Sequence, residues 1–247
     1  MLIDADAMLG RHPRRDVGPG TVTHTLAEMD RFGISEALVS HSWSWLHDPH
    51  TGNLRLTELV AGRPRLRPCW VLLPATCGET GTPEEFAASA LAHGVAAVRA
   101  YPADHGYDLA GPDVAPVLDA VAAAGLPLLL DAQQAGWAAV EAVAAARPAL
   151  PIVVGGLGYR VLRQAAGVLA RTGNVHLGLA NLSSHCGLEW LADRFGPGRL
   201  VFGTGAPYRD PGESVTRLLW SELDDGAVAA VGSGNLLGLL RAEARAA

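Results

Sequence analysis

The feature that most constrains the fold of this chain is a repeated alternation between short apolar runs and longer helical runs. Eight apolar runs have the length and composition of strands: Leu2–Ala5, Glu36–Ser40, Leu66–Leu73, Val95–Ala100, Pro127–Asp131, Pro151–Val154, Val175–Leu179 and Leu200–Gly203. Most are continuously apolar, which is typical of parallel strands that are covered on both faces. The pattern predicts an α/β fold and a single (β/α)8 barrel over residues 1–247, regular or distorted, since such barrels need about 250 residues.

Helix-terminating residues support this interpretation. The helical runs Thr21–Arg31, Val114–Ala124 and Val161–Arg171 are each followed by a glycine within two residues, and glycine just beyond a helix end is a common stop signal. A doubly wound open sheet is the alternative. No GxGxxG sequence follows the first strand and no phosphate-binding loop is present, which argues against the nucleotide-binding form of that alternative.

Composition and charge exclude several classes of protein. Hydrophobic residues make up 49% of the chain, which is enough to bury a large core and excludes global disorder. The net charge of −6 argues against a nucleic-acid partner, which needs a basic face. No uninterrupted apolar run reaches the ~18 residues of a membrane span, so no membrane association is expected. A small-molecule substrate or ligand is therefore the expected partner.

The cysteines and the first residues bear on localisation. Cys69, Cys77 and Cys186 form no CxxC pair and no disulfide framework, which favours a reducing cytoplasm. Asp4 and Asp6 interrupt the first apolar stretch, so we expect no signal peptide. For a chain this apolar, a homodimer is the default expectation.

Polar side chains follow several strands at the end where parallel barrels carry their active sites. Asp131 ends the fifth strand, and partial burial there would raise its pKa and suit it to proton transfer, or it forms a structural ion pair with Arg99 or Arg160. Asp4 and Asp6 lie two residues apart, so both should point the same way and could bind a cation or share a proton. The alternative is that Asp4 caps a turn and that Asp6 is a solvated carboxylate without a further role.

Further candidates would bind or transform a substrate. Arg99 and Tyr101 end the fourth strand, where an arginine suits a substrate carboxylate or an internal ion pair with Asp131. His185 is a candidate acid or base after the seventh strand. The segment His41–His50 is interpreted as a loop whose tryptophans, Trp43 among them, shape a pocket, or as a packed surface loop. The other substrate-binding candidates are Tyr159 and Arg160 at a helix start, and Tyr208 after the eighth strand.

Five segments, in order along the chain, resemble the amidohydrolase superfamily and specifically its small single-domain branch. They are IDADAMLG at Ile3–Gly10, GLPLLLD at Gly125–Asp131, PIVVGGLG at Pro151–Gly158, RLVFGTGAP at Arg199–Pro207 and GSGNLLGLL at Gly232–Leu240. The family writes the first as I-D-x-H-x-H-x-G and the fourth as R-(L/I)-x-F-G-(S/T)-D-x-P. The resemblance covers nearly the whole chain and implies the same barrel.

The departures concern the metal site that the resemblance implies. The family binds divalent metals through paired histidines on strand one, histidines on strands five and six, and an aspartate on strand eight. The corresponding positions here are Asp6, Met8, Asp131, Gly156 and Gly205. Glycine has no side-chain ligand and methionine is a soft one, so the family's metal chemistry does not transfer directly.

Three functions remain open from the sequence. The first is a metal-independent enzyme that uses Asp131, His185 and Asp6 for acid–base chemistry on a small anionic or polyhydroxylated substrate, by lactone or amide hydrolysis, decarboxylation or isomerisation. The second is a metal-dependent hydrolase with a rebuilt ligand set of Asp4, Asp6 and Asp131. The third is a non-catalytic pseudoenzyme or ligand-binding subunit. On the first and third interpretations no cofactor is expected.

Overall fold

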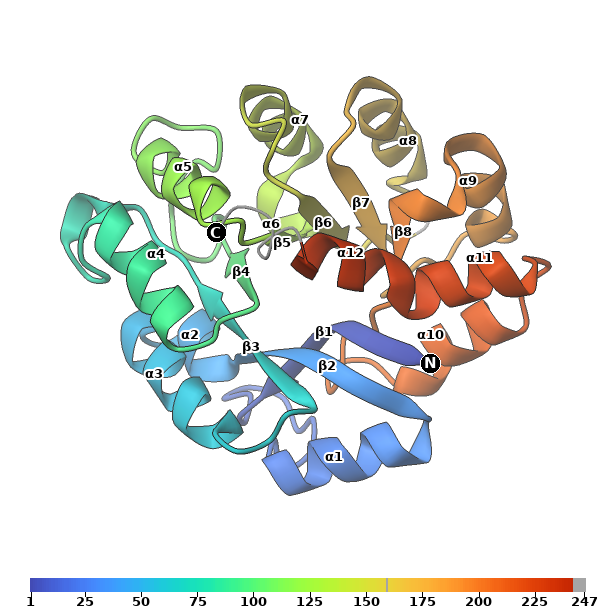
Figure 1. The fold of residues 1–247 in the computed structure, drawn as a ribbon, viewed down its shortest axis with the longest axis horizontal. Coiled ribbons are helices and arrows are strands. Elements are labelled where there is room, and N and C mark those ends of the chain that lie inside the picture. Colours follow the sequence, from blue (N-terminus) through green and yellow to red (C-terminus); the bar gives the residue numbers. More distant parts are fainter. Residues whose placement is uncertain (159, 242–247) are drawn as a thin grey trace.

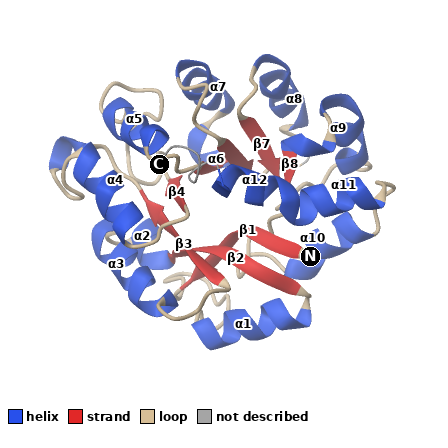
Figure 2. Ribbon diagram, in the orientation of Figure 1, coloured by secondary structure: helices blue, strands red, loops and turns tan. Residues whose placement is uncertain are grey.

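Eight parallel strands form the centre of the molecule, in the order in which they occur in the chain. A computed structural model describes residues 1–158 and 160–241. The strands are β1 Leu2–Leu9, β2 Ile34–His41, β3 Leu66–Val71, β4 Ala97–Ala100, β5 Leu128–Asp131, β6 Ile152–Gly155, β7 Val175–Gly178 and β8 Leu200–Val201. Each overlaps one of the eight expected runs, and the predicted (β/α)8 barrel is confirmed (Figures 1 and 2).

The barrel closes between β8 and β1 through backbone hydrogen bonds beyond the end of β8. The Ala5 amide donates to the Phe202 carbonyl at 3.0 Å, and the Gly205 amide donates to the Asp6 carbonyl at 2.8 Å. The Met8 amide donates to the Ala206 carbonyl at 2.9 Å. Because β8 itself is only two residues long, these bonds attach the segment that follows it to the long strand β1.

Helices surround the strands as an outer layer (Figure 2). The longer ones are α1 Val22–Arg31, α3 Pro49–Val60, α4 Pro83–Ala92, α5 Ala115–Ala123, α7 Trp137–Ala146, α8 Leu162–Arg171, α9 Gly187–Phe195 and α10 Pro211–Leu219. The shorter ones are α2 Ser42–Leu46, α6 Ala132–Ala135, α11 Asp225–Ala229 and α12 Asn235–Arg241, with single turns η1 Ala75–Cys77, η2 Pro197–Arg199 and η3 Ala230–Gly234. Local capping defines several starts: at α4, the Glu85 amide donates to Thr82 Oγ1 and the Thr82 amide to Glu85 Oε2.

The segment after β2 differs from the prediction. A loop was expected over His41–His50, whereas residues 42–46 form α2 and α3 begins at Pro49. Asp48 caps α3, since its Oδ1 accepts from the Thr51 amide at 3.3 Å and Pro49 stands in the first turn. The Asp48-Pro49 pair is itself a helix-start signal in the sequence. The loop prediction was based on the aromatic residues and did not take this pair into account.

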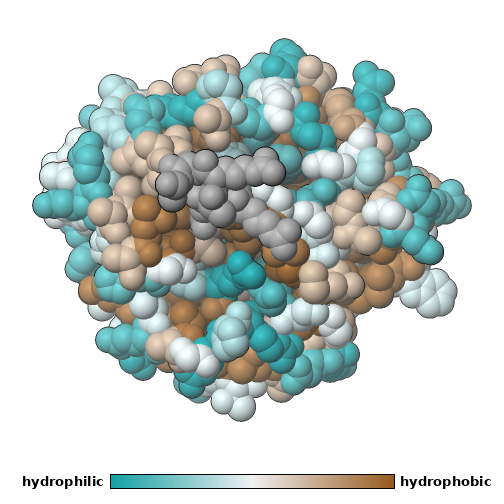
Figure 3. Space-filling view, viewed as in Figure 1, coloured by the Kyte–Doolittle hydropathy of each residue, from teal (hydrophilic) through white to brown (hydrophobic). Residues whose placement is uncertain are grey.

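One end of the barrel is filled. Ile3, Leu38, Cys69 and Leu129 point into the barrel and pack with Leu236 and Leu240 of α12. Figure 1 shows α12 lying across this end, and on the same face Figure 3 shows hydrophilic side chains interspersed with smaller apolar areas. Because α12 covers this end of the barrel, the opposite end, where the strands finish, is left for a site. None of the described helices is both long and apolar enough to cross a bilayer.

Candidate active site

A pocket of about 290 Å³ lies where the strands end. Its floor is made by residues of β1, β4, β5 and β6, and its rim by residues that follow β1, β2, β5 and β8. The small side chains Ala5, Gly155, Gly178 and Gly203 leave room at the base, so the interior is open above the packed layer. The charged side chains described below lie around this space.

Asp6 and Arg99 form an ion pair at the pocket floor. Arg99 Nη2 donates to Asp6 Oδ1 at 2.6 Å, and Arg99 Nη1 donates to the Tyr101 hydroxyl at 3.3 Å. Burial opposes the charge on the guanidinium, but attraction to Asp6, Tyr101 and Cys69 outweighs burial and raises the pKa of Arg99. A permanent positive charge therefore lies among apolar strands, next to a carboxylate that faces the pocket.

Asp131 is the second carboxylate of the pocket. Its Oδ1 accepts from the Gln133 amide at 2.7 Å, which caps the short helix α6. Burial raises the pKa of Asp131, opposed by the Gln133 hydrogen bond, and the charge of nearby Asp6 raises it further. The structure brings Asp131 and Arg99 into one pocket, but no ion pair joins them: Arg99 is paired with Asp6 instead.

Two glycines at family metal-ligand positions are covered by side chains. A Cβ on Gly156 would overlap the Asp131 carboxylate, and Gly156 has a φ of +69°. A Cβ on Gly205 would lie 3.1 Å from Arg209 Cδ, and Gly205 has a φ of +74°. The positive φ favours glycine at both positions, and at Gly156 the Asp131 carboxylate also leaves no room for a side chain.

The expected pairing of Asp4 with Asp6 is wrong. Between Asp4 and Ala7 the register against β2 shifts, because three residues of β1 match two of β2, and this bulge turns Asp4 away from the pocket. Asp4 is buried, and its carboxylate accepts from the Asp6 amide at 2.9 Å and from the Thr204 amide at 2.9 Å and hydroxyl at 2.5 Å. Burial raises the pKa of Asp4 to about 6. Its contacts join β1 to the segment after β8.

The donors of the pocket do not suit a divalent cation. Asp6 is already bound to the Arg99 guanidinium, Asp4 lies outside the pocket, and Met8 offers only a thioether. Over residues 1–158 and 160–241, no three histidine, cysteine, aspartate or glutamate side chains are grouped so that they could hold a metal ion. The expected alternative ligand set of Asp4, Asp6 and Asp131 is therefore not assembled.

Aromatic side chains form one wall of the pocket. Trp45 of α2 stacks on Tyr101 with ring centroids 5.1 Å apart and an interplanar angle of 14°, and Tyr208 meets Trp45 edge-on at 5.6 Å. The Trp45 indole donates to Asp104 Oδ2 at 2.5 Å, and His105 Nε2 lies 2.8 Å from the Trp45 carbonyl. These contacts fix a flat apolar surface of the kind that binds a planar ring.

Trp43 does not line the pocket, although it was a substrate-binding candidate. Its side chain is 47% exposed, and its ring meets His41 and His47. Because α2 is a helix, residues two apart point in different directions, so Trp45 lines the pocket and Trp43 does not.

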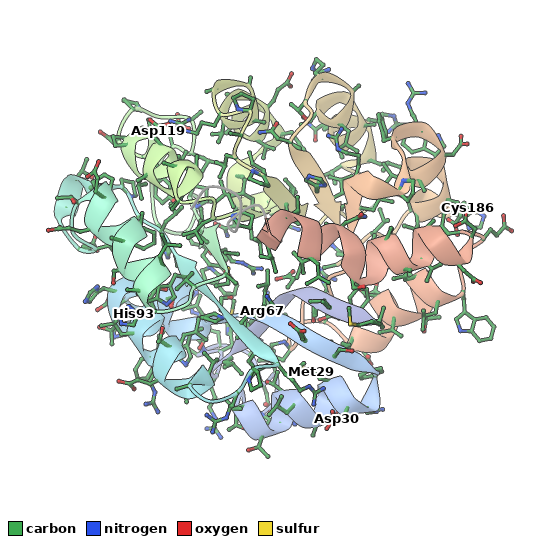
Figure 4. All side chains as sticks on the ribbon, viewed as in Figure 1. Met29, Asp30, Arg67, His93, Asp119 and Cys186 are labelled. Carbon is green, nitrogen blue, oxygen red and sulfur yellow. The ribbon has the colours of Figure 1, made fainter. Side chains whose placement is uncertain are left out.

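Two further candidates lie outside the pocket. His185 is exposed, with Nε2 3.4 Å from Cys186 Sγ, after the chain turns at Asn181 with a φ of +61°. Figure 4 shows the adjacent Cys186 at the outer edge of the molecule. Arg160 is exposed and is not among the lining residues, and Tyr159 lies outside the described residues. These side chains were predicted to face the pocket because they follow strand ends closely in the sequence. Closeness to a strand end does not determine whether a loop turns toward the pocket or away from it.

Four rim residues had no predicted role: Gln133, Gln134 and Arg209, which follow strand ends, and Arg15. Gln134 Nε2 donates to Asp104 Oδ2 at 2.8 Å, and Gln134 Oε1 accepts from the Asp104 amide at 3.0 Å, which joins the loops after β4 and β5. The sequence signal for Gln133, Gln134 and Arg209 was their place just after strands β5 and β8. Arg15 carried no such signal, since it lies six residues beyond β1.

Comparison with known proteins identifies the family. The amidohydrolase family model matches residues 3–241. No curated protein sequence matches the chain. Three similar solved structures share the fold at low sequence identity, and each belongs to a different enzyme.

A 5-carboxyvanillate decarboxylase from Sphingomonas paucimobilis is 17% identical, with a TM-score of 0.74, covering 97% of this chain and 98% of that one. A protein assigned as a 2-pyrone-4,6-dicarboxylic acid hydrolase from Pseudomonas putida is 19% identical, with a TM-score of 0.73 and 98% of both chains covered. A dihydroxybenzoic acid decarboxylase from Polaromonas sp. JS666, with bound manganese and the inhibitor 2-nitroresorcinol, is 15% identical, with a TM-score of 0.75, covering 97% and 96%. The match of the family model over nearly the whole chain, on a barrel whose site lies at the strand ends, shows that the chain belongs to the amidohydrolase family.

Proposed function

We propose that the chain is an enzyme that binds a small planar acid in this pocket and removes its carboxylate by proton transfer from Asp131, without a metal ion. The observation that carries the proposal is the arrangement of the floor. Asp131 covers Gly156, and beside it Asp6 is paired with the Arg99 guanidinium at 2.6 Å. A proton-transfer group and a fixed positive charge therefore share one open pocket.

In the proposed reaction the ring lies against Trp45 and Tyr101. Protonated Asp131 gives its proton to the ring carbon that bears the carboxylate. The bond from that carbon to the carboxylate then breaks, its electron pair returns to the ring and carbon dioxide leaves. Asp131 regains a proton from solvent. Burial supports this role because it raises the pKa of Asp131 and so increases the fraction of protonated acid.

Arg99 supplies positive charge at the floor. In a pocket of low dielectric a fixed guanidinium stabilises an anionic substrate more than it would in water. The ion pair with Asp6 holds the Arg99 guanidinium in place and partly neutralises its charge. We infer that Asp6 is a positioning residue. Within the described residues 1–158 and 160–241, no histidine, cysteine, aspartate and glutamate side chains are grouped in threes that could hold a metal ion, and this supports a metal-independent reaction.

Lactone hydrolysis is the second candidate, favoured by the similarity to the 2-pyrone-4,6-dicarboxylic acid hydrolase. There ionised Asp131 would act as a general base that takes a proton from the attacking water. The two reactions require opposite protonation states of the same residue. Their pH profiles therefore differ in direction, and decarboxylation weakens as pH rises through the pKa of Asp131 while hydrolysis strengthens.

The test is a turnover assay on chelator-treated protein with and without added Mn²⁺ or Zn²⁺. The substrates are 2,6-dihydroxybenzoate, 5-carboxyvanillate and 2-pyrone-4,6-dicarboxylate, with carbon dioxide release and ring opening recorded separately. We expect carbon dioxide release that is unchanged by chelator and that falls about 10²–10⁴-fold in Asp131→Asn. The matched control is Asp113→Asn, an exposed aspartate outside the pocket. Activity only with added metal would overturn the metal-independent mechanism, and binding without turnover would favour the non-catalytic alternative.

A further inference from the structure

Two arginines stand at the pocket rim with no carboxylate partner. Arg15 follows β1 and Arg209 follows β8, and both line the pocket. Within the described part of the chain neither side chain forms an ion pair or a hydrogen bond, in contrast to Arg99 at the floor. A rim cation with no protein partner is available to an anionic group of a ligand.

The stem of Arg209 is held by Gly205. A Cβ at Gly205 would lie 3.1 Å from Arg209 Cδ and 3.4 Å from its Cγ, so the methylene groups pack directly on the glycine backbone. The Arg209 amide donates to the Gly205 carbonyl at 3.1 Å. This packing restricts the side chain of a residue that is only half-buried, and so lowers the entropy cost of binding an anion.

Arg15, whose side chain is exposed, belongs to a loop with a closed base. The Gly10 amide donates to the Gly20 carbonyl at 2.8 Å, and a Cβ on Gly20 would overlap the Gly10 backbone, so the two ends of the loop 11–19 meet closely. His12 of this loop packs edge-on against Trp45, with centroids 6.0 Å apart, and against Tyr208 at 5.5 Å. The loop is therefore docked on the aromatic wall, and this brings Arg15 to the rim.

The charges of the pocket are unevenly placed. Of the described lining residues, three are arginine and two are aspartate. Asp6 is paired with Arg99, and Asp131 forms no ion pair with either Arg15 or Arg209. Positive charge that no carboxylate balances is therefore concentrated at Arg15 and Arg209. Both side chains line the same pocket as Asp131 and Trp45.

We propose that Arg15 and Arg209 form a second anion subsite, so that the substrate is a planar acid with a second anionic group, carboxylate or phosphate, at the rim. The inference rests on the proposed function, in which the reacting carboxylate lies beside Asp131 at the floor. The rim pair would then select dianions over monoanions and fix which end of the ring faces Asp131.

Isothermal titration calorimetry with three probes tests this subsite. Benzoate carries one anionic group, isophthalate carries two carboxylates, and 3-phosphonobenzoate carries a carboxylate and a phosphonate. For the wild type we expect each dianion to bind at least about tenfold more tightly than benzoate at constant ionic strength. If only isophthalate binds tightly, the subsite is specific for a carboxylate. If only 3-phosphonobenzoate binds tightly, the subsite is specific for a phosphate. Either result supports the proposal.

Two variants locate the effect, with an unfolding curve to verify that each is folded. Arg15→Gln should lose at least about fivefold of the dianion preference and leave the Kd of benzoate within about twofold. Arg14→Gln is the matched control, since it removes the same charge from the same loop at an exposed residue that does not line the pocket. Arg209→Gln provides an independent second variant and should also reduce the preference.

The outcomes separate the two proposals. Equal affinity of the wild type for benzoate and both dianions, or equal losses in Arg14→Gln and Arg15→Gln, would overturn the subsite and leave the proposed function standing. No binding of any of the three acids would overturn the subsite and count against a planar acid as the substrate of this pocket.

Discussion

The Asp131 carboxylate occupies the space where a side chain on Gly156 would begin, so these two residues depend on each other across neighbouring strands β5 and β6. Glycine at 156 is what allows the carboxylate to lie over β6 and face the pocket. At a position where the family's metal-binding members carry a ligand, this chain therefore accommodates the side chain of its neighbour.

Gly156→Ala should displace Asp131 and lower activity strongly, by about 10²-fold, because proton transfer depends on position. It should also reduce the free energy of unfolding by about 1–3 kcal/mol, since alanine is strained at a φ of +69°. Turnover and urea unfolding measure the two effects. Gly155→Ala is the control, as its Cβ would meet its nearest atom, Asp6 Oδ2, at 3.6 Å. Similar activity in the two variants would show that the position of Asp131 does not depend on glycine at position 156.

Asp6→Asn should destabilise the protein by about 3 kcal/mol, because it leaves the Arg99 guanidinium without its charged partner among apolar strands. The double variant Asp6→Asn/Arg99→Met should recover part of that loss, since it removes the unpaired charge. It should not recover ligand binding, which needs the cation. Urea unfolding of the two single variants and the double variant gives the coupling free energy, and additive effects would show that the ion pair contributes nothing.

Stability should depend on pH through Asp4. Burial raises the pKa of Asp4 to about 6 in the folded protein, above its value in the unfolded chain. The folded state therefore binds the proton more tightly, and this contribution favours folding below about pH 4 and is lost as pH rises to about 6. Linkage gives a change of about 3 kcal/mol over that window.

Asp4→Asn should remove this slope and should be more stable than the wild type at pH 7. Its amide can still accept from the backbone and donate to Thr204 Oγ1. Unfolding free energies measured from pH 4 to 8 provide the check, with Asp113→Asn as an exposed control. A wild-type slope that persists in Asp4→Asn would show that another group carries it.

Trp45→Ala should weaken the binding of planar acids about tenfold, because it removes the ring that stacks on Tyr101. Trp43→Ala, two residues away on the same short helix, should leave affinity unchanged, since Trp43 lies outside the pocket. Calorimetric titration of both variants with isophthalate measures the difference. Equal effects would mean that the loss arises from disruption of α2 rather than from loss of stacking.

Much of the barrel could be predicted because its information is local. Continuous apolar runs such as those of β5 and β6 identify strands buried on both faces, and glycines after helices mark where the chain turns back. The position of Asp131 at the end of an apolar run placed it at the mouth for the same reason. The family resemblance, carried by motifs at the strand ends, is confirmed by the match over residues 3–241.

The composition of the site depended on contacts between distant segments. A one-residue bulge in β1 turns the Asp6 side chain into the pocket and the Asp4 side chain away from it. The short helix α2 directs Trp45, and not Trp43, toward the pocket. Arg15 reaches the rim only because His12 packs on Trp45 and Tyr208. Sequence patterns determined the strands and the end of the barrel that carries the site, because burial periodicity is a property of each segment. Which charges meet was decided by tertiary packing, because strand register and loop docking depend on partners far away in the chain.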